Sequence, residues 1–363
     1  MRHTVILAGG GTGGHVYPAL AMGDALRAQG QDVRYYGDAA RLEGRVAPER
    51  GYSFRGVTAA QFPRSGLLAK LRFAFSLVAN VAAARRLLRA DRATLVLGVG
   101  GYVMAPTVLA AWTLGIPTAI HESNVTPGLA NRLCARVSRL VLLTYDETRK
   151  HLTGTAEAVT VGCPVNPLVA SGDATKYGLP AGKPVLLVVG GSLGAATIND
   201  VALACAVDPD RRYTILHLTG PRYFDELSER YRALPGGVPE DVAVRAYEDR
   251  MGDAFVAASL VLARAGSSTL AELCAVGLPS VLIPSPNVTD NHQEANARGL
   301  ERAGAARVYV ERSLDARDIA TDTRALLDDP VALAGMATAA RSLARAGVAD
   351  EVAALLLSRF PPA

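Results

Sequence analysis

A glycine-rich loop near the start of the chain is the first candidate phosphate site. Residues 9–14 (GGGTGG) contain the spacing G-x-G-x-x-G, follow an apolar strand-like run, and precede a helical pattern that Pro18 opens and Gly30 ends. Backbone N–H groups at such a helix start can bind a diphosphate. Glycines also serve ordinary strand-to-helix turns, so this loop alone does not identify a ligand.

Two more loops of the first half combine glycine or polar residues with a preceding strand. Residues 100–102 (GGY) follow the strand-like residues 94–97, and residues 121–124 (HESN) end the next strand. Because the carboxyl ends of parallel strands meet at one edge of a sheet, all three loops should converge there. His15, at the end of the first loop, is a candidate general base, and Glu122 is its rival. His121 taken alone is more typical of a structural histidine.

The second half carries a matching set of loops. Residues 190–194 (GGSLG) again follow an apolar strand, and residues 264–269 (RAGSST) lead into a helix that contains Glu272. Hydroxyls and amides at a helix start suit phosphate oxygens, and Glu272 could accept hydrogen bonds from ribose hydroxyls. The alternative is plain N-capping by Ser267 or Ser268. A later polar loop could read sugar hydroxyls or simply be solvated, and it holds Asp290, Asn291, His292, Gln293 and Asn296.

The elements that must position these loops alternate between strand and helix along the whole chain, which predicts parallel sheets built from βαβ units. The same order occurs twice, beginning at residue 5 and again at residue 185. We expect an α/β fold with two Rossmann-like domains facing each other across a cleft, residues 1–163 and 164–344. Residues 163–184 have the proline and glycine content of a linker, and the helix within residues 345–363 is expected to pack back on the first domain.

Composition excludes several classes of protein. With 38 basic and 34 acidic residues the net charge is +4, which argues against a nucleic-acid partner. The four cysteines lie far apart, so neither a disulfide framework nor a zinc site is predicted, and we assign no metal or cofactor. The N-terminus reads as a strand and not as a secretory signal, which favours the cytoplasm. Residues 93–120 lack charge, but glycines and prolines divide them into a buried strand-helix-strand unit.

One segment has the mixture of apolar and basic residues expected at a membrane surface. Residues 62–75 (FPRSGLLAKLRFAF) should lie on an anionic bilayer. The alternative is an internal helix with snorkelling basic ends. The predicted membrane patch consists of Phe62, Leu67, Leu68, Lys70, Arg72 and Phe75.

Taken in order, these motifs resemble one known family. Residues 10–18 (GGTGGHVYP), 100–103 (GGYV), 189–195 (VGGSLGA), 264–269 (RAGSST) and 291–297 (NHQEANA) are similar to the family 28 glycosyltransferases of peptidoglycan synthesis, over nearly the whole chain. The resemblance implies a GT-B fold and inverting transfer of N-acetylglucosamine from UDP-N-acetylglucosamine to the MurNAc 4-hydroxyl of undecaprenyl-diphosphate-linked MurNAc-pentapeptide. It also implies a peripheral protein on the cytoplasmic face of the bacterial membrane.

The resemblance assigns roles to residues of this chain. His15 and Glu122 become the catalytic candidates. The acceptor diphosphate is assigned to Gly11, Gly13, Gly14, Gly100, Gly101 and Tyr102. Donor binding is assigned to Thr12, Gly13, Gly14, Asn124, Ser192, Glu248, Ser267, Ser268, Thr269, Glu272, His292 and Gln293.

Two positions depart from the family pattern. Asn166 stands where the family usually has an arginine that contacts the donor phosphate, and Glu248 stands where an apolar residue commonly lies beside the uracil. A backbone contact at residue 248 would survive that change.

Other functions remain open at this point. They are a UDP-sugar transferase that acts on a diacylglycerol, a UDP-sugar epimerase of the same plan, and a nucleotide-sugar binding module without catalysis. Asp38 also follows the second strand where a dinucleotide's ribose would bind, so a dehydrogenase is a more distant alternative. The second glycine loop argues against it, because a dehydrogenase with one Rossmann domain would not need that loop.

Overall fold

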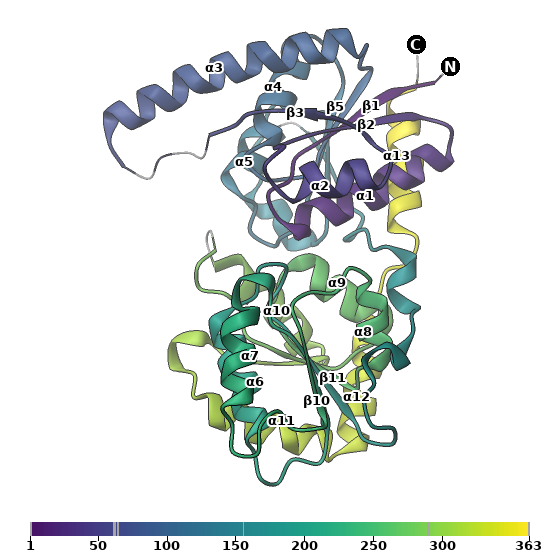
Figure 1. Cartoon of the computed structure of the whole chain (residues 1–363). Helices are drawn as coiled ribbons and strands as arrows, with labels where there is room; N and C mark the ends of the chain where they lie inside the picture. Colours follow the sequence, from purple (N-terminus) through teal and green to yellow (C-terminus); the bar gives the residue numbers. More distant parts are fainter. Residues whose placement is uncertain (1, 61–62, 64, 155, 289–290, 362–363) are drawn as a thin grey trace. The chain divides into compact units, whose positions relative to one another are not determined.

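The computed structural model describes residues 2–60, 63, 65–154, 156–288 and 291–361. The chain forms two compact units (Figure 1), one of Met1–Val165 with Gly347–Ala363 and one of Asn166–Ala346. Each unit is built around a parallel β-sheet, as the alternating sequence pattern predicts.

The sheet of the first unit has its strands in the order β3-β2-β1-β4-β5-β6-β7. The order reverses between β1 and β4, which is the switch point where ligands bind in open parallel sheets. The strands are almost wholly apolar at the centre because helices cover both faces. Their bounds are β1 Thr4–Ala8, β2 Asp32–Gly37, β3 Ser53–Gly56, β4 Leu95–Gly98, β5 Thr118–Glu122, β6 Leu140–Leu143 and β7 Glu157–Thr160.

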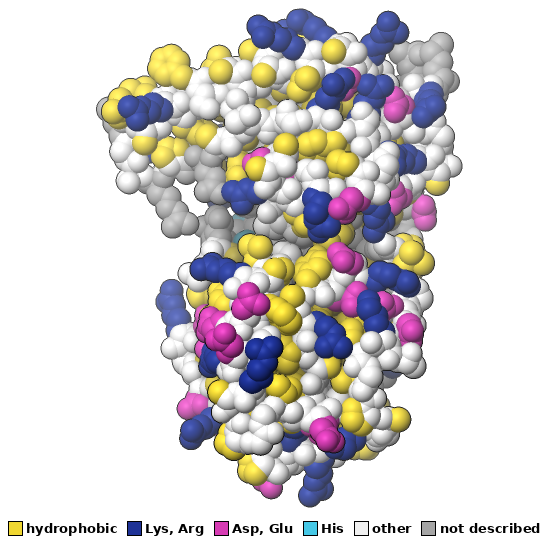
Figure 2. Space-filling view, in the orientation of Figure 1, with side chains coloured by type: hydrophobic (Ala, Val, Ile, Leu, Met, Phe, Trp, Pro, Cys, Tyr) yellow, Lys and Arg dark blue, Asp and Glu magenta, His cyan; other side chains and the backbone are white. Residues whose placement is uncertain are grey.

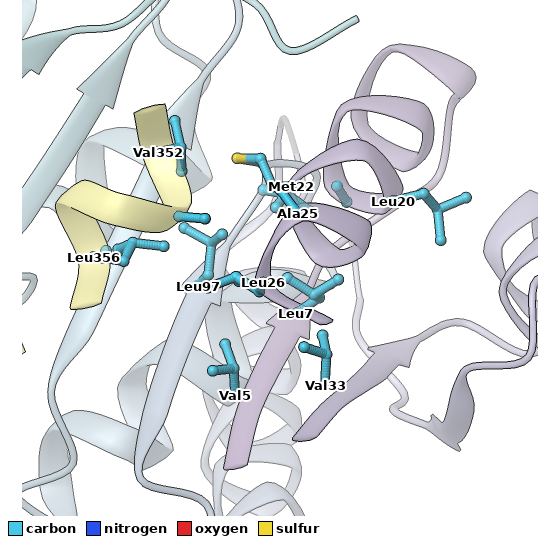
Figure 3. Packing of buried hydrophobic residues seen from close by; sticks show 14 of the residues in the cluster. Val5, Leu7, Leu20, Met22, Ala25, Leu26, Val33, Leu97, Val352 and Leu356 are labelled. Atoms are coloured by element: carbon cyan, nitrogen blue, oxygen red, sulfur yellow. The ribbon is translucent and has the colours of Figure 1, made fainter. Parts of the chain in front are cut away.

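Alternate strand residues of the first unit pack on opposite helical layers. Val5 and Leu7 belong to one buried cluster with Leu26 of α1 and with Val352 and Leu356 of α13 (Figure 3). The opposite face of the sheet packs on α3, α4 and α5. The helices are α1 Gly13–Ala28, α2 Leu42–Glu49, α3 Leu67–Ala90, α4 Met104–Thr113, α5 Leu129–Ala135, α13 Val348–Arg359 and the 3-10 helix Asp146–His151.

The C-terminal end of the last helix, α13, forms a hydrogen bond and an ion pair with other residues of the first unit. The His3 ring nitrogen Nε2 donates to the Phe360 carbonyl oxygen at 2.7 Å, and Arg359 pairs with Glu157 at 2.7 Å. The chain therefore leaves the first unit after Val165 and returns to it at Gly347.

The second unit repeats the same arrangement in the order β10-β9-β8-β11-β12-β13, with its switch point between β8 and β11. Its strands are β8 Val185–Val189, β9 Thr214–Leu218, β10 Val242–Arg245, β11 Leu260–Ala263, β12 Ser280–Leu282 and β13 Ala306–Val308. Its α-helices are α6 Ala196–Ala206, α7 Phe224–Arg232, α8 Met251–Ala257, α9 Ser267–Val276, α10 His292–Arg302, α11 Ala316–Leu327 and α12 Pro330–Ser342. Short 3-10 helices are Pro167–Ala170, Ala174–Tyr177, Pro221–Tyr223 and Glu311–Ser313.

The uncharged segment 93–120 folds as predicted, since it supplies β4, α4 and most of β5. Among the described residues, no helix combines the length and the apolar character needed to cross a membrane. One prediction is wrong, because His292 and Gln293 do not lie in a loop. They form the first turn of α10, and Asn296, predicted in the same loop, is buried further along this helix, while Asp290 lies outside the described residues.

Candidate active site

The glycine loop after β1 packs directly on the loop after β4. The Gly10 N–H donates to the Gly100 carbonyl oxygen at 3.2 Å. A side chain at Gly9 would overlap the Gly100 carbonyl oxygen, and one at Gly101 would overlap that of Gly10. Both loops therefore need glycine for close backbone approach, and the structure joins two of the predicted loops at the switch point.

A buried carboxylate supports this loop from beneath. Glu43 of α2 is fully buried, and its two oxygens accept the Gly11 N–H at 2.9 Å and the Asp38 N–H at 3.1 Å. A side chain at Gly10 would overlap this carboxyl group. Sequence reasoning missed Glu43, because an acid in the first turn of a helix already has an ordinary explanation in the helix dipole.

The Glu43 contact changes the roles expected of the loop glycines. The Gly11 amide already binds a carboxylate, whereas Gly13 and Gly14 lie in the first turn of α1, whose N–H groups the helix cannot satisfy itself. Gly13 and Gly14 are therefore better placed than Gly11 to bind a phosphate. Asp38 does not present a free ribose-binding acid, since one of its oxygens accepts the Ala40 N–H at 3.0 Å in a local turn.

His15 is half-buried in the first turn of α1 and lies beside both loops. Its Nδ1 is 3.2 Å from the Gly10 carbonyl oxygen and 3.3 Å from the Thr12 hydroxyl. Because a carbonyl oxygen only accepts, the neutral ring carries its proton on Nδ1, and Nε2 is the basic nitrogen. A Cβ at Gly100 would lie 2.7 Å from Nε2, so this glycine gives the ring its space.

The last residues of β5, His121 and Glu122, form a buried cluster with the residues that follow the strand. His121 is fully buried and donates from Nε2 to the Gly162 carbonyl oxygen at 3.1 Å, and burial lowers its pKa to about 4. Burial raises the pKa of Glu122 to about 7, although its Oε1 accepts the Asn124 N–H at 2.9 Å. With only 2% of its surface exposed, Glu122 is less able than His15 to reach a substrate hydroxyl.

In the second unit, the loop after β8 packs on the loop after β9. A side chain at Gly194 would overlap the Thr219 carbonyl oxygen, which also accepts a hydrogen bond from Asn199 at 3.2 Å. Ser192 is half-buried within this loop. The switch point of the second sheet thus repeats the close backbone packing seen in the first.

Helix α9 begins at the other side of that switch point. Its N-cap is Gly266 and no side chain caps it, so the alternative prediction of capping by Ser267 or Ser268 is wrong. The Ser267 hydroxyl is buried and has no hydrogen-bond partner among the described residues. Ser268 and Thr269 are half-buried in the same turn. A helix end with free amides and an unsatisfied hydroxyl is suited to an anionic ligand.

Glu272 lies one turn further along α9 and is half-buried. Burial raises the pKa of its carboxyl group to about 7. On α10, the Gln293 Oε1 accepts the Ser285 N–H at 2.9 Å, so the Nε2 group is the part of this side chain that can donate to a ligand. His292 is half-buried beside it.

The two departures from the family pattern have structural explanations. Asn166 caps the 3-10 helix Pro167–Ala170 by accepting the Leu168 N–H at 3.0 Å. Glu248 is buried and accepts from Lys176 and Tyr177, each at 2.8 Å. Burial acts to raise the pKa of Glu248, but these partners outweigh it and the net pKa is lowered. The Glu248 side chain is therefore engaged by its own unit, and a backbone contact to a ligand at this residue stays a prediction.

From Leu67 onward, the predicted membrane segment forms the start of α3. Leu68, Phe75 and Lys70 are exposed there, while Phe62 and the Leu67 side chain lie outside what the structure describes. Arg72 is exposed as well. Sequence reasoning missed Leu71 and Val78, which with Leu68 and Phe75 make an apolar stripe at helical spacing. Figure 2 shows yellow apolar and dark blue basic side chains on this part of the first unit, at the upper left.

Two Rossmann-like parallel sheets, each with a glycine-rich loop at its switch point, define the GT-B class of glycosyltransferases. Residues 5–142 match the glycosyltransferase family 28 N-terminal domain, and residues 185–352 match the family's C-terminal domain. The chain belongs to glycosyltransferase family 28.

Named relatives match nearly the full length. The Acidithiobacillus ferrooxidans protein named UDP-N-acetylglucosamine–N-acetylmuramyl-(pentapeptide) pyrophosphoryl-undecaprenol N-acetylglucosamine transferase is 41% identical, covering 98% of this chain and 97% of its own. The protein of that name from Salinibacter ruber is 40% identical, covering 96% and 95%. The crystal structure of Acinetobacter baumannii MurG superposes with a TM-score of 0.75 at 27% identity, covering 99% of this chain and 100% of its own.

Proposed function

We propose that the chain transfers N-acetylglucosamine from UDP-N-acetylglucosamine to the 4-hydroxyl of MurNAc in undecaprenyl-diphosphate-linked MurNAc-pentapeptide, which converts lipid I to lipid II. The observation that carries this proposal is the 41% identity, over nearly all of both chains, to the Acidithiobacillus ferrooxidans enzyme named for that transfer. The geometry of both switch points supports it.

In this proposal the second unit binds the donor. The start of α9 holds the UDP diphosphate, Glu272 accepts from the ribose hydroxyls, and Gln293 donates to the sugar. Ser192 and His292 line the same set of loops, and the backbone at residue 248 meets the uracil. The further donor contacts carried over from the family are Thr12, Gly13, Gly14 and Asn124.

The first unit binds the acceptor and supplies the base. The glycine loops 9–14 and 100–102 hold the lipid diphosphate, chiefly through amides of the α1 start. His15 Nε2 removes the proton from the MurNAc hydroxyl while its oxygen attacks the anomeric carbon. The bond from that carbon to the UDP oxygen breaks in the same step, so the configuration inverts. The positive end of α9 stabilises the charge that develops on UDP.

The transfer is tested by incubating the purified chain with radiolabelled UDP-N-acetylglucosamine and a short-chain lipid I analogue. We expect label in the lipid product and far slower reaction with UDP-glucose, because polar groups built for the acetamido sugar are left unpaired by the wrong sugar. Equal use of both donors would contradict the donor assignment. Epimerised donor, or tight UDP binding with no labelled lipid, would support one of the alternative functions.

The pKa of Glu272 predicts how donor binding depends on pH. Its pKa is raised to about 7, so the carboxylate is mostly neutral at pH 6 and mostly charged at pH 8. A carboxylate that only accepts hydrogen bonds suits the two ribose hydroxyls, so the KM for UDP-N-acetylglucosamine should fall by roughly tenfold from pH 6 to pH 8. Glu272→Gln removes the titrating carboxyl group and does not change the ionisation of the UDP donor, so only the pH dependence caused by Glu272 should be lost. A pH profile that keeps its slope in Glu272→Gln would exclude the role of Glu272.

We also propose that the stripe of Leu68, Leu71, Phe75 and Val78 lies on the cytoplasmic face of the bacterial membrane, where the lipid acceptor resides. Phe75 and Val78 are 76% and 70% exposed, and Lys70 and Arg72 are exposed on the same helix. Such a face gains free energy by burying its apolar side chains, while the basic residues attract anionic headgroups.

Changing Leu68, Phe75 and Val78 together to Ser should weaken binding to vesicles of phosphatidylglycerol, measured by co-sedimentation, by about 1,000-fold, since each side chain contributes about 1.5 kcal/mol when buried. Val331→Ser is the matched control, because Val331 is 81% exposed in the second unit. If the triple variant is folded and still binds vesicles like the parent, the membrane face lies elsewhere.

A further inference from the structure

An exposed arginine stands beside the glycine loops of the first unit, and none of the roles above uses it. Arg41 is the residue before α2, and its side chain is half exposed. Its Nη2 donates to the Tyr102 hydroxyl at 3.3 Å, and its Nε lies 3.9 Å from the Asp38 carboxylate. The Asp38 contact is too long for a hydrogen bond, so the guanidinium keeps most of its capacity to bind an anion.

The position of Tyr102 connects Arg41 to the loops. Tyr102 follows Gly101, whose Cα lies against the Gly10 carbonyl group, and Gly10 precedes the start of α1. Arg41, the Tyr102 hydroxyl and the first amides of α1 therefore belong to one edge of the sheet. The sequence places Arg41 in an unremarkable polar turn, so only the fold reveals this proximity.

The charges around the loop favour a cation beside it when a diphosphate binds. Glu43 places a buried negative charge directly beneath Gly10 and Gly11 and takes up the Gly11 amide. A diphosphate brought to the same loop would meet repulsion from this charge, which is stronger inside a protein than in water. The amides of Gly13 and Gly14 carry only partial charges. Arg41, two residues before Glu43, is the side chain positioned to offset it.

We propose that Arg41, with the Tyr102 hydroxyl, binds the diphosphate of the lipid acceptor. This inference rests on the proposed function and adds to it the residue that supplies the positive charge. A guanidinium presents a planar fork of donors that matches two phosphate oxygens, and it is always charged. The role is binding and not proton transfer, so it should govern acceptor affinity and leave donor affinity unchanged.

The inference is tested by steady-state kinetics of Arg41→Ala with the short-chain lipid I analogue. Loss of a charge-assisted contact should raise the KM for the lipid analogue by about 10-fold to 100-fold, while the KM for UDP-N-acetylglucosamine stays within about twofold. Arg45→Ala is the matched control, because Arg45 carries the same charge one turn further on, within α2, but pairs with Glu49 at 3.1 Å. Where Arg41→Ala does not fold, Arg41→Gln removes the charge and retains a donor for Tyr102.

A second measurement identifies the diphosphate as the partner. Farnesyl diphosphate should inhibit the parent more strongly than farnesyl monophosphate or farnesol, and Arg41→Ala should lose most of that preference. If the variant keeps the parent's preference and acceptor KM, or if Tyr102→Phe alone reproduces the whole effect, Arg41 only supports Tyr102 and the inference is overturned. Failure of the proposed function is distinct, because the parent itself would then not label the lipid.

Discussion

His15→Ala is expected to lower kcat by about 100-fold or more while the affinity for UDP stays close to that of the parent. The bond from Nδ1 to the Gly10 carbonyl oxygen fixes the ring and makes Nε2 the basic nitrogen. The neighbouring Gly100 leaves the ring its space. Removing the imidazole therefore removes the proton acceptor, whereas the proposed UDP contacts at α9 are untouched. Pre-steady-state transfer and calorimetric binding of UDP measure the two effects separately.

Two controls make this experiment decisive. His151→Ala removes an exposed histidine of the same unit and should leave kcat unchanged. Glu122→Gln tests the rival base. The Glu122 side chain is buried, and its Oε1 accepts hydrogen bonds from the backbone N–H and the side-chain Nδ2 of Asn124. Near-parental turnover of folded His15→Ala, together with a large loss in Glu122→Gln, would transfer the role to Glu122.

The fold could be predicted in detail because its signals are local and repeated. Apolar runs such as residues 185–189 mark strands buried on both faces, and glycine directly follows elements such as β1, β8 and α9. The repeat of the same order from residue 5 and from residue 185 indicated two units of one kind, and both sheets show the same strand order around their switch points.

Parts of the candidate site were less accessible to sequence reasoning. The loops at strand ends, and His15 within them, follow from the rule that parallel strands end at one edge. The start of α10 was read as a loop, because polar residues such as Asn291 and Gln293 weaken the helical pattern, and Asn291 adopts the left-handed conformation just before the helix begins.

Arg41 and Glu43 were missed for a different reason. Both gain their significance from contacts across the fold, to Tyr102 and to Gly11, which are 61 and 32 residues away in the sequence. A charged residue near a helix start has an ordinary local explanation, and nothing in its spacing signals a tertiary contact. The pairing of such a residue with a glycine loop becomes visible only when backbone positions are known.

Glu43→Ala is expected to lower the free energy of unfolding of the first unit by about 2–4 kcal/mol, because the N–H groups of Gly11 and Asp38 lose their acceptor and a cavity opens beneath the loop. Urea denaturation measures this change, and Glu49→Ala is the control, since Glu49 is an exposed acid on the same helix.

Glu43→Gln separates the shape of the side chain from its hydrogen bonds. The amide oxygen of the glutamine can accept a hydrogen bond from the N–H of either Gly11 or Asp38. The NH2 group would then face the other N–H, and because both are donors no hydrogen bond can form between them. We therefore expect a smaller loss of stability than in Glu43→Ala. Turnover of the acceptor should also fall, because the loop that carries His15 and the α1 amides must shift to separate the two donor groups. UDP affinity should fall less than acceptor turnover, since the proposed donor diphosphate and ribose contacts lie in the second unit and only the donor contacts at Thr12, Gly13 and Gly14 lie on the shifted loop. If Glu43→Gln is as stable and as active as the parent, the carboxylate does not hold the loop in place. The repulsion between the Glu43 charge and a bound diphosphate, which Arg41 is proposed to offset, then has no measurable effect either.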